Sequence, residues 1–148
     1  MATIRLQRDF KEFLRLLNAH GVEYLLIGGY AVNYYGFTRS TGDLDVWIER
    51  SDVNARRIAE ALREFGFGEA APEMFVEPEQ IVRLGVPPFR IEIHTDISGV
   101  EFRECYSGRE TAEFEGQPVP VLNLDDLKRN KRASGRLKDL ADLEALDG

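Results

Sequence analysis

Apolar residues recur along the chain with two different spacings, which predict both helices and strands. In residues 9–20 they lie three and four positions apart, as on one face of a helix, and Gly21 follows as a helix stop. The same spacing runs from Ser51, a residue type that caps helix starts, to Gly66, which ends the pattern. The first half of the chain therefore predicts two amphipathic helices.

Three segments have the patterns of buried strands. Residues 22–27 form an apolar run that ends at a pair of glycines, and residues 43–49 alternate between apolar and other side chains. Residues 89–97 form a third such segment, which begins after two prolines and is followed by Ser-Gly. A short helix is expected over residues 30–35, between the first two strands.

The remaining segments predict shorter elements and two terminal helices. Short strands are expected at 74–76 and 81–84, a short helix at 100–106, and a hairpin from 111–114 and 119–122. Asn123 or Asp125 caps a helix that Gly135 interrupts, and residues 136–146 form a last helix whose leucines are expected to make core contacts.

Strands and helices alternate early in the chain, and hairpin signals come late. This order predicts a single α+β (α/β) domain over residues 1–148, in which a mixed β-sheet carries helices mainly on one face. The N-terminal helix falls within residues 1–21 and the C-terminal helices fall within residues 123–148. A chain of 148 residues is long enough for one domain with its own hydrophobic core.

The composition points to a soluble globular protein. Hydrophobic residues make up 43% of the chain and charged residues 30%, which is ordinary for that class. No apolar run approaches the roughly 18 residues that a membrane span needs, and the first residues lack a secretory hydrophobic segment. The single cysteine, Cys105, excludes an internal disulfide and is expected to fill space in the core. We therefore expect a cytoplasmic protein without a membrane partner.

The formal net charge of −7 argues against a protein that coats nucleic acids non-specifically. The charge is uneven, because residues 128–138 contain six basic residues and no acidic one. A basic patch on an acidic protein suits a phosphate-rich substrate that is held at one place. The alternative is a solvated helix face, whose cations pair with neighbouring aspartates.

The glycine pair Gly28-Gly29 lies between a predicted strand and a predicted helix. Glycines at such a junction expose backbone N–H groups at a helix start, where an anion can approach closely. The segment contains neither a dinucleotide-binding G-x-G-x-x-G nor a P-loop. A phosphate-binding turn and a plain turn are both compatible with the pair alone.

Carboxylates on two predicted strands form the candidate metal site. Asp43 and Asp45 are two positions apart and therefore share one strand face, where a divalent cation such as Mg²⁺ or Mn²⁺ would relieve their repulsion. Glu92 lies between apolar neighbours on a second strand and reaches the pair if the two strands are adjacent. His94 and Asp96 fall on the same face as Glu92, so either could flank the site. Three carboxylates around one point can hold two metal ions.

These residues resemble the nucleotidyltransferase superfamily, also called the DNA polymerase β-like fold. The resemblance rests on Gly28-Gly29, Asp43-Leu-Asp45 and Ile91-Glu92-Ile93 in this order, and on the terminal segment 131–142. The amino-acid sequence of these segments is similar to that of the small bacterial minimal nucleotidyltransferases, including toxin-type members of the AbiEii kind. The superfamily usually has aspartate as the third acid and often has Gly-Ser as the turn, whereas this chain has glutamate and Gly-Gly.

The resemblance implies transfer of a nucleoside monophosphate from an NTP to an acceptor hydroxyl, with release of pyrophosphate. It implies that Asp43, Asp45 and Glu92 bind Mg²⁺ or Mn²⁺ and are catalytic. The nucleotide-binding residues that it implies are Gly28, Gly29, Arg39, Thr41, Lys131, Arg136 and Lys138. The implied acceptor is an RNA such as tRNA, a protein or a small molecule.

Two alternatives to plain catalysis remain open from the sequence. Glu92 in place of the usual aspartate is compatible with a catalytically inactive module that keeps the fold and binds a nucleotide or a partner protein. The resemblance to AbiEii-type proteins also implies a toxin–antitoxin pair, in which an antitoxin or operon partner would bind the chain.

Overall fold

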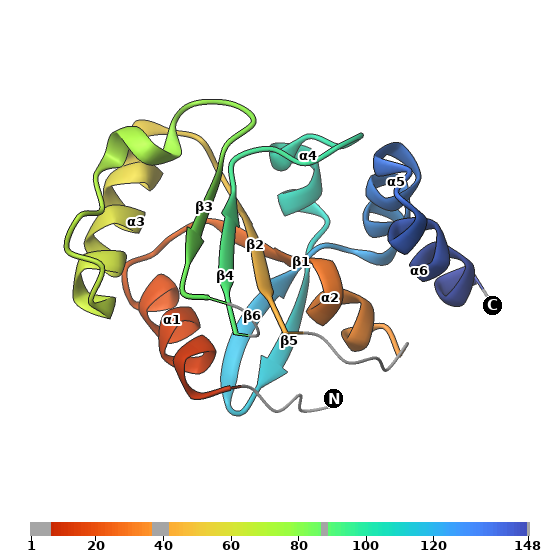
Figure 1. Cartoon of the computed structure of the whole chain (residues 1–148), viewed down its shortest axis with the longest axis horizontal. Coiled ribbons are helices and arrows are strands. Elements are labelled where there is room, and N and C mark those ends of the chain that lie inside the picture. The colour runs from red at the N-terminus through yellow and green to blue at the C-terminus, as the bar shows by residue number, and fades with distance from the viewer. Residues whose placement is uncertain (1–6, 37–41, 87–88, 148) are drawn as a thin grey trace.

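The computed structural model describes residues 7–36, 42–86 and 89–147, which form one mixed sheet flanked by helices (Figure 1). The strands run in the order β3-β4-β2-β1-β6-β5. Their bounds are β1 Tyr24–Ile27, β2 Leu44–Ile48, β3 Ile81–Leu84, β4 Ile91–His94, β5 Glu110–Phe114 and β6 Gln117–Val121. The helices are α1 Arg8–Ala19, α2 Gly28–Tyr34, α3 Asp52–Phe65, α4 Phe102–Ser107, α5 Leu124–Ser134 and α6 Leu137–Asp147, with a 3₁₀ turn η1 at Pro72–Phe75.

The central strands of the sheet combine parallel and antiparallel pairing. β2 pairs antiparallel with β1 and parallel with β4, while β1 pairs parallel with β6. The edge strands β3 and β5 pair antiparallel with β4 and β6. The predicted mixed sheet and α+β class are therefore confirmed, including the adjacency of the two strands that carry the candidate acids.

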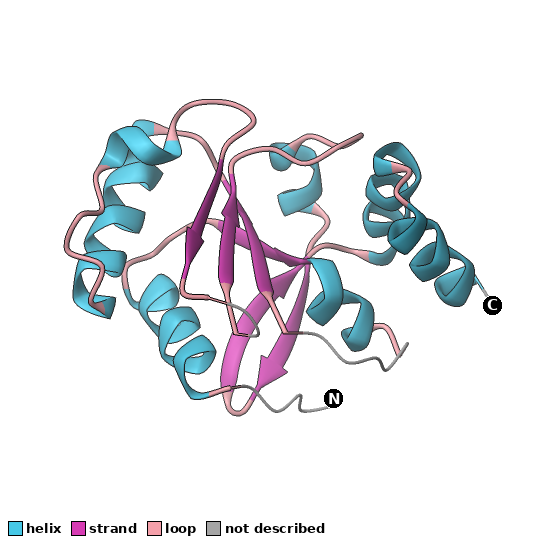
Figure 2. Cartoon of the chain, viewed as in Figure 1, coloured by secondary structure: helices cyan, strands magenta, loops and turns pink. Residues whose placement is uncertain are grey.

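The two long helices cover one face of the sheet and close the main core. Figure 1 shows α1 and α3 side by side at the left of the strands, and Figure 2 shows that the remaining helices flank the strands on the other side. Phe13 of α1 packs edge-on against Phe65 of α3 at 5.7 Å between ring centroids. Leu44, Val46 and Ile48 of β2 are buried on this side, as the alternation predicts.

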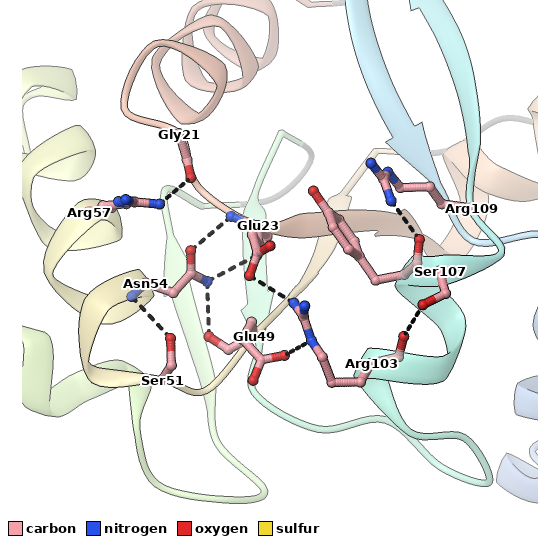
Figure 3. Close-up of polar contacts among 10 residues, drawn as sticks. Gly21, Glu23, Glu49, Ser51, Asn54, Arg57, Arg103, Ser107 and Arg109 are labelled. Carbon is pink, nitrogen blue, oxygen red and sulfur yellow. Dashed lines mark hydrogen bonds and ion pairs between the residues drawn. The ribbon is translucent and has the colours of Figure 1, made fainter.

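A buried asparagine fixes α3 to the ends of β1 and β2 (Figure 3). The Asn54 side chain donates to the carbonyls of Glu23 and Glu49 at 3.0 and 2.9 Å, and accepts from the Glu23 amide at 2.8 Å. Arg103 of α4 pairs with both glutamate side chains, at 2.7 Å from Glu23 and 3.0 Å from Glu49. Ser51 caps α3 through the Asn54 amide. These contacts hold one end of the β1–β2 pair, and the opposite end carries Asp45.

Most predicted elements are found within a few residues of their expected bounds, but the strand expected at 74–76 is wrong. Residues 72–75 form the η1 turn, with Pro72 at its start and Phe75 buried. Proline fixes φ near the helical value, so it favours a turn of helix over an extended strand. The expected strand at 81–84 is present as β3 and pairs with β4.

The expectation that the leucines of the last helix are core contacts is wrong for two of them. Leu137 is 87% exposed and Leu140 is 44% exposed, whereas the buried residues of α6 are Asp139 and Asp142. The helix therefore turns its carboxylates inward, because α5 presents a buried cation to them. None of the helices in the described ranges has the length and apolar character that a bilayer crossing requires.

Candidate active site

Two carboxylates and an arginine lie in one row across three adjacent strands. Asp45 of β2 is the direct neighbour of Glu92 on β4, and Glu92 is the direct neighbour of Arg83 on β3. Directly paired residues on neighbouring strands point to the same face of a sheet and come within side-chain contact. The strand pairing therefore brings Glu92 to the Asp43–Asp45 segment, which the sequence alone left conditional.

His94 joins the two acids to form the centre of the site. Its Nε2 atom lies 2.9 Å from Asp45 Oδ1 and 4.0 Å from Glu92 Oε1. One ligand atom from each of Asp45, Glu92 and His94 can be chosen so that all three lie within 4.8 Å of one another. The three side chains are only 13–17% exposed, and all three line a cleft.

Two arginines neutralise part of the acidic charge. Arg90 contacts Asp43 Oδ2 and Glu92 Oε2 at 3.3 Å each, so the third carboxylate reaches the cluster through a shared guanidinium group. The Arg83 Nε atom donates to Glu92 Oε2 at 2.8 Å. We refer to Asp43, Asp45, Glu92 and His94 as the carboxylate cluster.

Gly28 is required at its position because the Asp45 side chain lies directly against it. A Cβ atom at Gly28 would lie 2.6 Å from Asp45 Oδ2, and the residue has φ +68°, a conformation that favours glycine. The glycine pair forms the first turn of α2, so the helix starts earlier than expected. The two halves of the sequence motif, glycines and aspartates, are therefore in contact.

A cleft of about 740 Å³ connects the carboxylate cluster with the C-terminal helices. Gly28, Gly29 and the cluster lie along one wall, and residues of α5 and α6 and of the turn between them, among them Arg136 and Lys138, lie along the other. Its size is in the range of sites for small molecules and cofactors. The hydrogen bond to Asp139 raises the pKa of Arg136, and the charges of Asp139, Asp45 and Glu92 raise it further. Arg136 is therefore electrostatically coupled to the acids across the cleft.

Lys131 lies in a buried ion cluster between α5 and α6. Its ammonium group is 3.2 Å from Asp139 Oδ1 and 3.0 Å from Asp142 Oδ2, and the three side chains are 3–5% exposed. We refer to these residues as the lysine triad. Arg136 donates to Asp139 at 2.7 Å, and Ser134 donates to the same carboxylate. Burial alone would raise the pKa of Asp139, but the hydrogen bonds from Arg136 and Ser134 and the charge of Lys131 lower it below its usual value.

Most of the residues that the sequence predicts for the site line this one cleft. Arg39 and Thr41 lie outside the described residues. Arg83 and Arg90 line the cleft but are not among the predicted residues. The sequence is sufficient to predict Arg90, because this residue lies two positions before Glu92 and so shares its strand face. The position of Arg83 next to Glu92 depends on the register of the edge strand β3, which the sequence does not specify.

The donor set of the carboxylate cluster fits a divalent cation. Carboxylate oxygens are ligands for Mg²⁺ and Mn²⁺, and an imidazole nitrogen also binds transition ions. Cys105 does not belong to this set, because it lines a different cavity next to α4. Burial raises the pKa of its thiol to about 12, so the thiol stays protonated at neutral pH and is not activated as a nucleophile.

Solved structures with a similar fold include a proposed nucleotidyltransferase, an antibiotic-resistance factor and an adenylyltransferase. A proposed nucleotidyltransferase from Thermotoga maritima, TM1012, has a TM-score of 0.58 at 18% identity, over 95% of this chain and 89% of that one. The antibiotic-resistance factor ANT(2'')-Ia has a TM-score of 0.62 at 10% identity, over 94% and 80% of the two chains. The lincosamide antibiotic adenylyltransferase LnuA, solved with lincomycin, has a TM-score of 0.57 at 13% identity, over 97% of each chain.

Sequence comparisons assign no family to the chain. No protein-family model matches the chain, and no curated protein sequence matches it. At identities of 10–18% a structural likeness establishes the fold and not the reaction. The chain therefore has the single-domain nucleotidyltransferase-like fold that the resemblance implies.

Proposed function

We propose that the chain is a divalent-metal-dependent nucleotidyltransferase. It transfers a nucleoside monophosphate from an NTP to an acceptor hydroxyl and releases pyrophosphate. The observation that supports this most strongly is the direct pairing of Asp45 with Glu92 beneath the Gly28 turn, in a cleft whose other wall carries cations. The fold of the structural neighbours supports the same reaction class.

The metal would be held by Asp45, Glu92 and Asp43 of the carboxylate cluster. When bound, a divalent ion of this kind polarises phosphoryl oxygens and lowers the pKa of a coordinated hydroxyl. Asp45 and Glu92 are partly buried, so solvent screens the repulsion between their carboxylates only in part. A bound cation would offset this repulsion, which favours metal binding.

The remaining residues bind and orient the substrates. The N–H groups of Gly28 and Gly29 and the side chains of Arg136 and Lys138 would bind the triphosphate, since all four residues line the cleft. The acceptor oxygen would attack the α-phosphorus, the bond between the α-phosphorus and the oxygen that bridges to the β-phosphorus would break, and the hydroxyl proton would pass by way of Glu92 to solvent. Lys131 would hold the turn between α5 and α6, because two carboxylates already bind its ammonium group.

A small hydroxyl compound is the acceptor that we propose to test first. Among the structural neighbours, LnuA is a lincosamide adenylyltransferase and ANT(2'')-Ia is an antibiotic-resistance factor. The acidic net charge also disfavours a broad RNA surface. RNA and protein acceptors belong in the same assay as separate arms.

The test is transfer of label from each α-³²P-labelled NTP with Mg²⁺ or Mn²⁺, together with pyrophosphate release. Hydroxyl compounds, total RNA and cell protein serve as acceptors in parallel. Asp45→Asn and Glu92→Gln should lower transfer by about 100-fold or more. Glu113→Gln, the same chemical change on the far edge strand β5, should leave it unchanged. No transfer by the wild type with any acceptor would contradict the proposal.

A non-catalytic binding module is the second candidate. Arg83 and Arg90 already pair with Glu92 and Asp43, and such a compensated cluster can be purely structural. NTP binding by calorimetry without transfer would favour this module. Growth arrest on expression, relieved by Asp45→Ala, would place an active enzyme in a cytoplasmic toxin–antitoxin pair, whereas harmless expression would argue against that role.

A further inference from the structure

We propose that His94 supplies a nitrogen ligand to the metal, so that the site selects a first-row transition ion such as Mn²⁺ over Mg²⁺. This inference rests on the proposed function, because it concerns the metal of the same site. It goes further by adding a residue to the ligand set and by naming the class of ion.

The position of His94 supports ligation. The His94 Nε2 atom and Asp45 Oδ1 are 2.9 Å apart, and adjacent ligands of a six-coordinate ion with bonds of about 2.1 Å lie roughly 3 Å apart. Both atoms therefore already have the separation of neighbouring ligands. The side chain of His94 is 16% exposed, so the surrounding strands limit its movement away from the site.

The orientation of Glu92 also points to a shared centre with His94. Its Oε2 atom is occupied by Arg83 at 2.8 Å and by Arg90 at 3.3 Å. The other oxygen, Oε1, faces His94 Nε2 at 4.0 Å. The arginines thus act as positioning residues, which orient one carboxylate oxygen toward the histidine and the aspartate.

The mixture of donor atoms favours one class of ion. Mg²⁺ prefers oxygen ligands and retains its waters, whereas Mn²⁺ and the later transition ions also accept an imidazole nitrogen. A site whose carboxylates are joined by one imidazole therefore binds a transition ion in preference to Mg²⁺ more strongly than an all-carboxylate site does. The alternative is that His94 only donates a hydrogen bond to Asp45 and stays outside the ligand set.

Pulsed electron paramagnetic resonance of the Mn²⁺-loaded full chain separates these possibilities. Tag-free protein with ¹⁵N-labelled histidine is compared with unlabelled protein, so that a coupled imidazole nitrogen is identified by its isotope. The chain has two histidines, and His20 lies beside Glu60 and Glu64 on α3. His20→Gln is therefore the matched control for His94→Gln. Calorimetry measures the Mn²⁺ and Mg²⁺ affinities of all three proteins.

The expected result is imidazole coupling in the wild type and in His20→Gln, and its loss in His94→Gln. The preference for Mn²⁺ over Mg²⁺ should fall at least about 10-fold in His94→Gln only. Mn²⁺ binding without imidazole coupling would overturn the inference and leave the proposed function intact. Absence of Mn²⁺ binding together with absence of transfer would overturn both. The wild-type spectrum alone decides the ligand set, even if His94→Gln fails to fold.

Discussion

The carboxylate cluster lines the same cleft as Lys131 and Asp139 of the lysine triad, but the two groups differ in charge balance and exposure. In the triad, Lys131 pairs with both aspartates, and the triad side chains are 3–5% exposed; Arg136, outside the triad, also pairs with Asp139. In the carboxylate cluster, three acids face two arginines, and the side chains are 13–33% exposed. A balanced and buried cluster stabilises the fold, whereas an open cluster with excess acid can bind a cation. Substitutions in the carboxylate cluster should therefore lower activity without lowering stability, whereas substitutions in the lysine triad should lower stability.

The largest expected effect is on catalysis, from Asp45→Asn. Nucleotide transfer should fall by about 10³-fold, because an amide neither binds the metal nor carries its charge. The free energy of unfolding should stay the same or rise, since one repelling carboxylate is removed. Initial rates and urea unfolding measure the two effects. A loss of stability in parallel with the loss of activity would contradict a binding role for this cluster.

The converse change is Lys131→Met in the triad. It removes the buried cation that both carboxylates of the triad contact, which should lower the free energy of unfolding by about 3–5 kcal/mol. Urea unfolding provides the measurement. Lys138→Met, on the exposed surface of the same helix pair, should change stability by less than about 0.5 kcal/mol. Equal stability of Lys131→Met and wild type would show that the triad does not hold α5 against α6.

Gly28→Ala tests the contact between the glycine turn and the carboxylate cluster. The positive φ should cost about 1–2 kcal/mol of stability, and the new methyl group must also displace Asp45. Gly36→Ala is the matched control, because Gly36 also has positive φ but has open space around it. Both variants should lose stability, but only Gly28→Ala should lose Mn²⁺ affinity. Equal affinities by calorimetry would argue against the contact.

The smallest expected effect is the pH dependence of the triad. The pKa of Asp139 is lowered in the folded state, so its stabilising contribution is present above the unfolded pKa of about 3.9 and is lost as the pH falls through the lowered value. Urea unfolding between about pH 5 and pH 2 should therefore show a weaker pH dependence in Asp139→Asn than in the wild type. An unchanged slope in this variant would contradict the ion pairing.

Local signals made most of the fold predictable. Ser51 and Asn123 cap helices as expected, and Gly66 and Gly135 end them in left-handed conformations. Such signals act within a few residues and are readable from sequence. The strand expected at 74–76 failed because three apolar residues fit a buried 3₁₀ turn as well as a strand.

The candidate site was only partly predictable, because it depends on contacts between distant segments. Asp45 and Glu92 stood out as acids in apolar strands, but Arg83 enters through the pairing of β3 with β4, which no local pattern specifies. The burial of Lys131 depends on two aspartates across a turn. A run of basic residues in a sequence does not distinguish a solvated face from a buried ion cluster.

The pairing of Asp45 with Glu92 on parallel strands has a consequence for how the site arises. Side chains alternate between faces, so a slip of β4 by one residue would bury Glu92 and expose Ile91 or Ile93. The apolar core therefore rejects the one-residue slips, which would turn Glu92 away from the face that carries Asp45. Selection for a well-packed interior therefore also keeps the two acids on one face of the sheet. In the folded protein the carboxylate cluster is already assembled before any substrate binds.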